Sequence, residues 1–176
     1  MSDLLSAEIS SIAEFLAHAL ELEVESAERY RELADNMTVH NNPEVAALFR
    51  SLAAEGGLHV EQVKRRGAEF DLPNIAPWDF KWSCPEGPES PPMDDANYLM
   101  TKRQALELAL HNEIRGRDFY MQVAERSLNA ELQHIAGEMA AEEDIHVEML
   151  RKWLAKEAAN NLQQPLEDLD PPNMPE

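Results

Sequence analysis

The placement of proline divides this chain of 176 residues into four long segments that proline does not interrupt. Six of the eleven prolines lie between residues 73 and 92, and four lie between residues 165 and 175. The remaining one, Pro43, follows two asparagines and suits the first position of a helix. Because proline disrupts a helix interior, and because only six glycines occur, the uninterrupted segments favour helix.

The four segments carry apolar residues at alternating spacings of three and four, which is the pattern of a helix with one buried face. Capping boxes, Ser11 with Glu14 and Thr101 with Gln104, mark the starts of the first and third segments. The predicted helices cover about residues 11–35, 43–67, 101–127 and 130–160. Helices of this length, each ~38 Å long at the usual rise, predict an all-α, antiparallel four-helix bundle.

The predicted connections differ greatly in length. Short turns near residues 36–42 and 128–129 indicate two antiparallel hairpins. The proline-rich stretch of about residues 71–97 joins them as one long crossover between the second and third helices. Nearly thirty extended residues could reach ~80 Å, which exceeds the length of the bundle.

Three aromatic residues in the crossover, Trp78, Phe80 and Trp82, are expected to hold it against the bundle surface. A contact with a partner or a second copy is the alternative interpretation. We predict one bundle domain over residues 1–160. The remaining residues, 161–176, form an acidic, proline-rich tail that we expect to be flexible.

Composition excludes several classes of protein. The net charge of −19 argues against nucleic acid and anionic membrane as partners, because both require a basic face. The single cysteine, Cys84, allows neither an intrachain disulfide nor a thiolate metal cluster. No apolar run approaches the ~20 residues of a membrane span, and the N-terminus has no secretory pattern. We therefore expect a cytoplasmic protein.

The two predicted hairpins carry the same polar residues at the same intervals within their helices, with one exception. The second hairpin carries Glu113, Tyr120, Glu143 and His146. The first carries Glu23, Tyr30, Gly56 and His59. All these polar residues lie in otherwise apolar stripes, where a buried carboxylate or imidazole is costly unless another group holds it.

Residues equidistant from the turn of an antiparallel hairpin lie at one level. Glu23 and Gly56 are equidistant from the first turn, and Glu113 and Glu143 from the second. Because the hairpins repeat each other, a two-fold-related packing would bring both levels together in the middle of the bundle.

The combined level predicts a site for a pair of metal ions. Glu-x-x-His places both side chains on one helix face, and carboxylate-rich sites with a few imidazoles suit iron, manganese or zinc. The alternative is a set of surface glutamates paired with arginine and of satisfied core histidines. Tyr30 and Tyr120 either pack in the core or donate hydrogen bonds to ligand carboxylates. The other histidines are predicted to lie on the surface: His18, His40, His111 and His134.

Over about residues 11–156 the chain resembles the rubrerythrin-type branch of the ferritin-like superfamily. The matching segments are Ala19-Leu20-Glu21-Leu22-Glu23 through Tyr30, Ala109-Leu110-His111-Asn112-Glu113 through Tyr120, and Ala141-Glu142-Glu143-Asp144-Ile145-His146. The resemblance implies a ferritin-like bundle with a carboxylate-bridged di-iron centre that reduces peroxide, oxidises ferrous iron or activates oxygen. It also implies that the chain pairs as a homodimer. The metal ligands that it implies are Glu23, His59, Glu113, Glu143 and His146.

The chain departs from the family pattern in three places. Gly56 stands where the family has a bridging glutamate, and Gly116 stands where some members add a carboxylate. The single Cys84 cannot build the rubredoxin-like module of rubrerythrin proper, so any electron donor would be another protein. We predict an oxidoreductase, with a non-catalytic iron or zinc binding or storage protein as the alternative.

Gly56 is expected to change the chemistry of the site. Three carboxylates leave two divalent ions with a formal charge of +1, which a hydroxide, an exogenous acid or the loss of one metal would correct. Gly56 and Gly57 in mid-helix each cost ~1 kcal/mol relative to alanine. We hypothesise that they open a coordination position or distort the helix so that Glu55 can turn into the site.

Overall fold

The structure is a computed structural model that describes residues 9–82 and 99–163. Within these ranges it contains four long helices, a single turn of 3₁₀ helix and no strand. The helices are α1 (Ile12–Val39), α2 (Pro43–Gly67), α3 (Lys102–Arg126) and α4 (Ala130–Gln163), with the 3₁₀ turn η1 at Pro77–Asp79. The predicted all-α four-helix bundle is confirmed.

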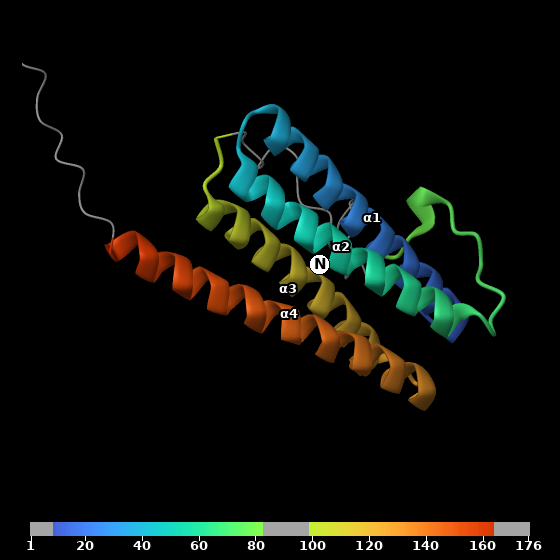
Figure 1. The fold of residues 1–176 in the computed structure, drawn as a ribbon. Helices are drawn as coiled ribbons and strands as arrows, with labels where there is room; N and C mark the ends of the chain where they lie inside the picture. The colour runs from blue at the N-terminus through green and yellow to red at the C-terminus, as the bar shows by residue number, and fades with distance from the viewer. Residues whose placement is uncertain (1–8, 83–98, 164–176) are drawn as a thin grey trace, which may run out of the picture.

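The bundle consists of two antiparallel hairpins, α1 with α2 and α3 with α4 (Figure 1). The end of α2 and the start of α3 lie at opposite ends of the bundle (Figure 1). The connection between them therefore has to traverse the length of the bundle, as the long crossover in the sequence predicts. Part of that crossover, residues 83–98, lies outside the described residues.

Local sequence signals explain where the helices begin. The Ser11 hydroxyl accepts a hydrogen bond from Glu14 N at 3.1 Å, but the Glu14 carboxylate accepts from Ser10 N and not from Ser11. The first predicted capping box is therefore only half formed. At α3 the box is complete, because Thr101 and Gln104 each cap the other's backbone N–H.

Two apolar clusters fill the bundle on either side of its middle. One contains Tyr30, Phe49 and Leu150, and the other contains Phe15 and Tyr120, among other residues. Burial of these side chains stabilises the packing of the hairpins by about 25 cal/mol per Å² of apolar surface. Between the clusters lies a layer of buried polar side chains, which is the level predicted from the two turns.

The described part of the crossover is held to the bundle by His18 of α1. His18 is fully buried, so its predicted surface position is wrong. Its Nε2 accepts a hydrogen bond from Lys81 N at 3.0 Å, and its Nδ1 lies 2.8 Å from Glu14 O. The rings of Phe80 and Trp82 contact the imidazole edge-on at 5.0 and 5.2 Å. Sequence could not show this partner, because it is distant along the chain.

The three crossover aromatics differ in their contacts. Phe80 and Trp82 stack on each other, and Trp82 also meets Phe119 of α3, so these two hold the crossover as predicted. Trp78, in contrast, is 83% exposed, so the prediction was wrong for this residue. Trp78 lies in η1, which contains no buried residue.

The other boundaries are close to those predicted. Helix α1 continues to Val39, four residues past the predicted end, and α4 continues to Gln163, past residue 160. The predicted flexible tail, from residue 164 on, lies outside the described residues. Among those described, no helix is long and apolar enough to cross a membrane.

Candidate metal centre

The polar layer in the middle of the bundle draws side chains from all four helices. Glu23 comes from α1, His59 from α2, Glu113 from α3, and Glu143 and His146 from α4. The three glutamates are buried, and the two histidines are partly buried. All five residues predicted as ligands therefore lie in one cluster, as their equal distances from the two turns predicted. Their role as ligands stays a prediction.

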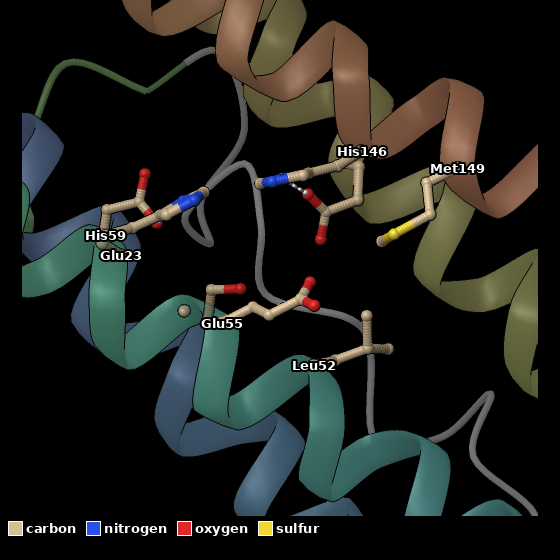
Figure 2. Close-up of a pocket in the computed structure, with 9 residues that line it drawn as sticks. Glu23, Leu52, Glu55, His59, His146 and Met149 are labelled. Atoms are coloured by element: carbon tan, nitrogen blue, oxygen red, sulfur yellow. Dashed lines mark ion pairs between the residues drawn. The ribbon is translucent and has the colours of Figure 1, made fainter.

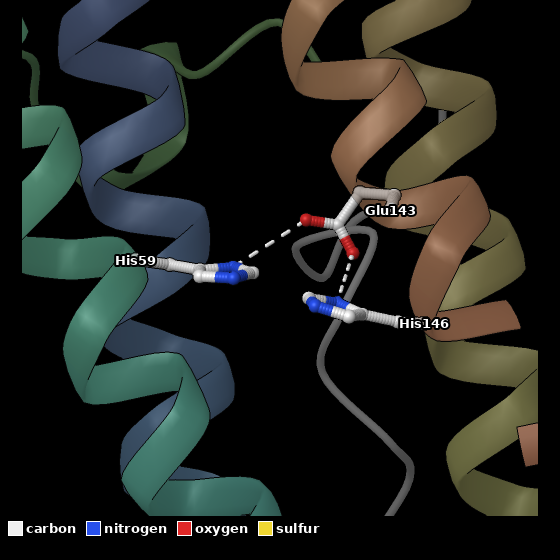
Figure 3. A group of neighbouring side chains, drawn as sticks. All are labelled: His59, Glu143 and His146. Carbon is white, nitrogen blue, oxygen red and sulfur yellow. Dashed lines mark hydrogen bonds and ion pairs between the residues drawn. The ribbon is translucent and has the colours of Figure 1, made fainter. Parts of the chain in front are cut away.

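Glu143 lies between the two imidazoles. Its Oε1 is 3.5 Å from His59 Nδ1, and its Oε2 is 3.3 Å from His146 Nδ1 (Figure 3). The two rings stack with their centroids 4.7 Å apart. Ligand-capable atoms of these three residues all lie within 4.8 Å of one another, which is close enough to share a metal ion.

Each remaining glutamate contacts the histidine of its own hairpin. Glu23 Oε2 lies 3.3 Å from His59 Nδ1, and Glu113 Oε2 lies 3.3 Å from His146 Nδ1. The centre therefore has two Glu–His pairs, one from each hairpin, with Glu143 joining them.

The tyrosines connect the two hairpins across the bundle. Tyr120 of α3 donates to Glu23 Oε1 at 2.9 Å, and Tyr30 of α1 donates to Glu113 Oε1 at 3.3 Å. Of the two interpretations from sequence, the hydrogen-bonded one is correct. These reciprocal bonds restrict the orientations of both carboxylates, which is the usual role of groups behind a metal ligand.

Burial and close carboxylates perturb the ionisation of the whole cluster. Burial raises the pKa of Glu23, and it raises the pKa of Glu113 to about 7. Burial would lower the pKa of His59, but hydrogen bonds to Glu143 and Glu23 outweigh it and raise the pKa to about 11. Hydrogen bonds to Glu113 and Glu143 raise the pKa of His146 to about 10.

Glu143 behaves differently from its neighbours. Burial would raise its pKa, but hydrogen bonds from His146 and His59 outweigh burial and lower it. The charged imidazoles thus neutralise the carboxylate that they share. The cluster as it stands requires positive charge at its centre.

The donor set fits a pair of divalent cations. Three carboxylates and two imidazoles are the ligand types that iron, manganese and zinc accept together, and bound metals would replace the protons on the imidazoles. Two small cavities adjoin the cluster, of about 20 and 10 Å³. Each is near the volume needed for a single water molecule.

Gly56 is a point of close contact between α1 and α2. A Cβ built at this position would lie 3.1 Å from the Ala27 Cβ, whereas a Cβ at Gly57 would meet nothing within 4 Å. Helix α2 is regular α-helix throughout, so the predicted distortion at the glycine pair is wrong. The room for a side chain at position 56 is occupied by the neighbouring helix.

Sequence reasoning missed one buried polar residue beside the centre. Asn112 is 1% exposed, and its Nδ2 donates to the Tyr30 hydroxyl at 3.1 Å. Its Oδ1 has no partner among the described residues. The available signal was an amide next to Glu113 on the buried face of a helix, at a position where the first hairpin has Leu22.

Fold and site together define a ferritin-like helical bundle with a buried carboxylate–imidazole centre. The family model described as Rubrerythrin matches residues 14–76 and 104–172, which include all five predicted ligands. The chain belongs to the rubrerythrin family.

A solved structure supports this assignment. The chain is 43% identical to an uncharacterised conserved protein from Magnetospirillum magnetotacticum, over 83% of this chain and 95% of that one, with a TM-score of 0.66. No curated protein matches the chain.

Proposed function

We propose that this protein is a non-haem di-metal oxidoreductase that binds two iron ions and acts on peroxide, oxygen or ferrous iron. The observation that carries the proposal is the position of Glu143, which contacts both imidazoles while a further carboxylate flanks each. Membership of the rubrerythrin family supports iron as the metal. Zinc or manganese would suit the same donors.

The residues divide between binding and orientation. Glu23 with His59, and Glu113 with His146, would each hold one cation, and Glu143 would contact both. Two ferrous ions bound there would supply the two electrons that, with two protons, reduce one hydrogen peroxide to two water molecules.

The surrounding side chains orient the carboxylates and restrict the entry of water. Tyr30 and Tyr120 fix the orientation of the two flanking carboxylates. The apolar clusters on either side limit the entry of water, so that charge interactions within the centre are weakly screened.

A non-catalytic iron or zinc binding or storage protein is the second candidate. The observation that favours it is Gly56, which leaves the set of five predicted ligands with three carboxylates. A centre with only three negatively charged ligands could hold a metal ion whose oxidation state does not change.

Anaerobic loading with ferrous iron, followed by stopped-flow mixing with peroxide or oxygen, separates the two candidates. The oxidoreductase is expected to bind two ions per chain, to be oxidised faster than free ferrous iron, and to turn over when a reductant is supplied. Absence of turnover, together with a preference for redox-silent zinc, would favour the binding protein.

A matched pair of variants ties the reaction to the centre. Glu143→Gln is expected to weaken metal binding by about 100-fold or more, because even outer-shell changes cost 10–100-fold. Glu148→Gln on the same helix removes an exposed carboxylate that pairs with Arg151, and it should leave binding unchanged.

Partners and location are also proposals. We expect a homodimer with an external protein as electron donor, because one cysteine cannot form a second iron site of the rubredoxin type. The net charge of −19 argues against nucleic acid and anionic membrane as partners. The single cysteine suits a reducing cytoplasm.

A further inference from the structure

Glu55 of α2 lines the 20 Å³ cavity beside the centre. The same cavity is lined by Glu23, His59 and His146 and by Met149. Figure 2 shows the Glu55 side chain extending from α2 toward α4, with its carboxylate on the side of the cavity where His146 and Met149 lie. In a regular helix Glu55 therefore already lines the cavity that adjoins the centre, without the distortion expected from the sequence.

The surroundings of Glu55 differ from those of its counterpart in the other hairpin. Glu142 precedes Glu143 as Glu55 precedes Gly56, and Glu142 forms an ion pair with Arg66 at 3.4 Å. Glu55 has no hydrogen bond or ion pair with any described residue. A partly buried carboxylate without a cationic partner, beside a centre that requires cations, is a candidate ligand.

The packing at Gly56 argues against an exogenous acid in place of the missing glutamate. Ala27 closes the space next to Gly56, and the adjoining cavity of about 20 Å³ has room for little more than one water molecule. The charge that the five predicted ligands lack is therefore more readily supplied by a side chain already present.

We propose that Glu55 is the fourth carboxylate of the metal centre and replaces the one absent at Gly56. With Glu55 the centre has four carboxylates for two divalent cations, which makes it formally neutral. The carboxylate that α2 contributes beside His59 would then come from Glu55, one residue before Gly56. This proposal rests on the proposed function, because it presupposes a pair of bound cations.

Titration with cobalt(II) tests the proposal without relying on activity, because cobalt(II) in carboxylate–imidazole sites has a ligand-dependent visible spectrum. The wild-type chain is expected to bind two ions. Glu55→Gln should bind one of them at least ~10-fold more weakly and should change the visible absorption. Glu61→Gln is the matched control, because Glu61 lies on the same helix, is exposed and pairs with Lys64. Its titration should superimpose on that of the wild type.

Two further measurements distinguish the loss of a metal ligand from the loss of folding. Thermal unfolding of the metal-free variants checks folding, and Glu55→Asp, which keeps the charge on a shorter side chain, should show intermediate affinity. A Glu55→Gln titration that matches the wild type in affinity and spectrum overturns the role of Glu55 and leaves the di-metal proposal intact. A wild-type chain that binds fewer than two cobalt ions overturns both.

Discussion

The two hairpins of the bundle carry the same motif but do not contribute equally to the centre. The second hairpin provides Glu113, Glu143 and His146, and its Glu143 contacts both imidazoles. The first provides Glu23 and His59, and at the position that corresponds to Glu143 it has Gly56 against Ala27. Where the second hairpin has a carboxylate that contacts both imidazoles, the first has close helix packing. The comparison shows that one position in a repeated motif can carry a buried polar side chain in one copy and a helix contact in the other.

Returning a glutamate to position 56 tests this comparison most strongly. Gly56→Glu should lower the free energy of unfolding of the metal-free protein by about 3 kcal/mol. The new Cβ meets Ala27 at 3.1 Å, and the new carboxylate joins three others. Urea denaturation in the presence of a chelator measures the change.

The neighbouring glycine provides the control. Gly57→Ala places a Cβ where nothing lies within 4 Å, so it should stabilise the protein by about 1 kcal/mol through helix propensity alone. If both variants had the same effect, the contact with Ala27 would not explain why position 56 is glycine.

Removing the tyrosine hydroxyls should have smaller effects on stability than Gly56→Glu. Tyr30→Phe should lower the free energy of unfolding by about 2 kcal/mol, because Glu113 loses a donor and Asn112 loses its acceptor. Tyr120→Phe should also lower it, by about 1.5 kcal/mol, because the buried Glu23 carboxylate loses a donor. Chemical denaturation measures both losses, and a Tyr30→Phe variant as stable as the wild type would contradict the role assigned to the hydrogen bond from Asn112.

The level of the centre was predictable because it depends only on helix periodicity and on distances from the turns. Glu23 and Gly56 are about equidistant from one turn, as Glu113 and Glu143 are from the other, and straight helices preserve that relation. The capping box at Thr101 was predictable for a similar reason, since both partners lie within one turn of helix. Local spacing therefore predicts most of the fold and the meeting of the five polar residues in one cluster.

The features that sequence missed depend on contacts between distant segments. His18 is buried by crossover residues some sixty positions away, so nothing near it in sequence distinguishes it from a surface histidine. Glu55 is offset along α2 from the side that carries Gly56 and His59, and the cavity that it lines beside the centre is formed by residues of the other helices as well. The close contact of Gly56 with Ala27 is likewise a property of helix packing and not of α2 alone.

His18 marks a last difference between the hairpins, since the corresponding position in the second is Leu108, which packs on an apolar cluster. Lys81 N donates to His18 Nε2, so Nε2 is unprotonated and the buried ring is neutral, with Glu14 and Lys81 as its charged neighbours. Burial lowers the pKa of His18 below its ordinary value of 6.5.

A lowered pKa of His18 means that the unfolded chain binds the proton more tightly than the folded one. The stability that His18 contributes is therefore complete above pH 6.5 and is lost as the pH falls through the folded-state pKa. The effect should be no more than about 1 kcal/mol, the value of one hydrogen bond, and should first release the crossover. Tryptophan fluorescence between pH 7 and 5 monitors Trp82 beside His18. The transition should be absent in His18→Gln, and its persistence there would assign it to another group.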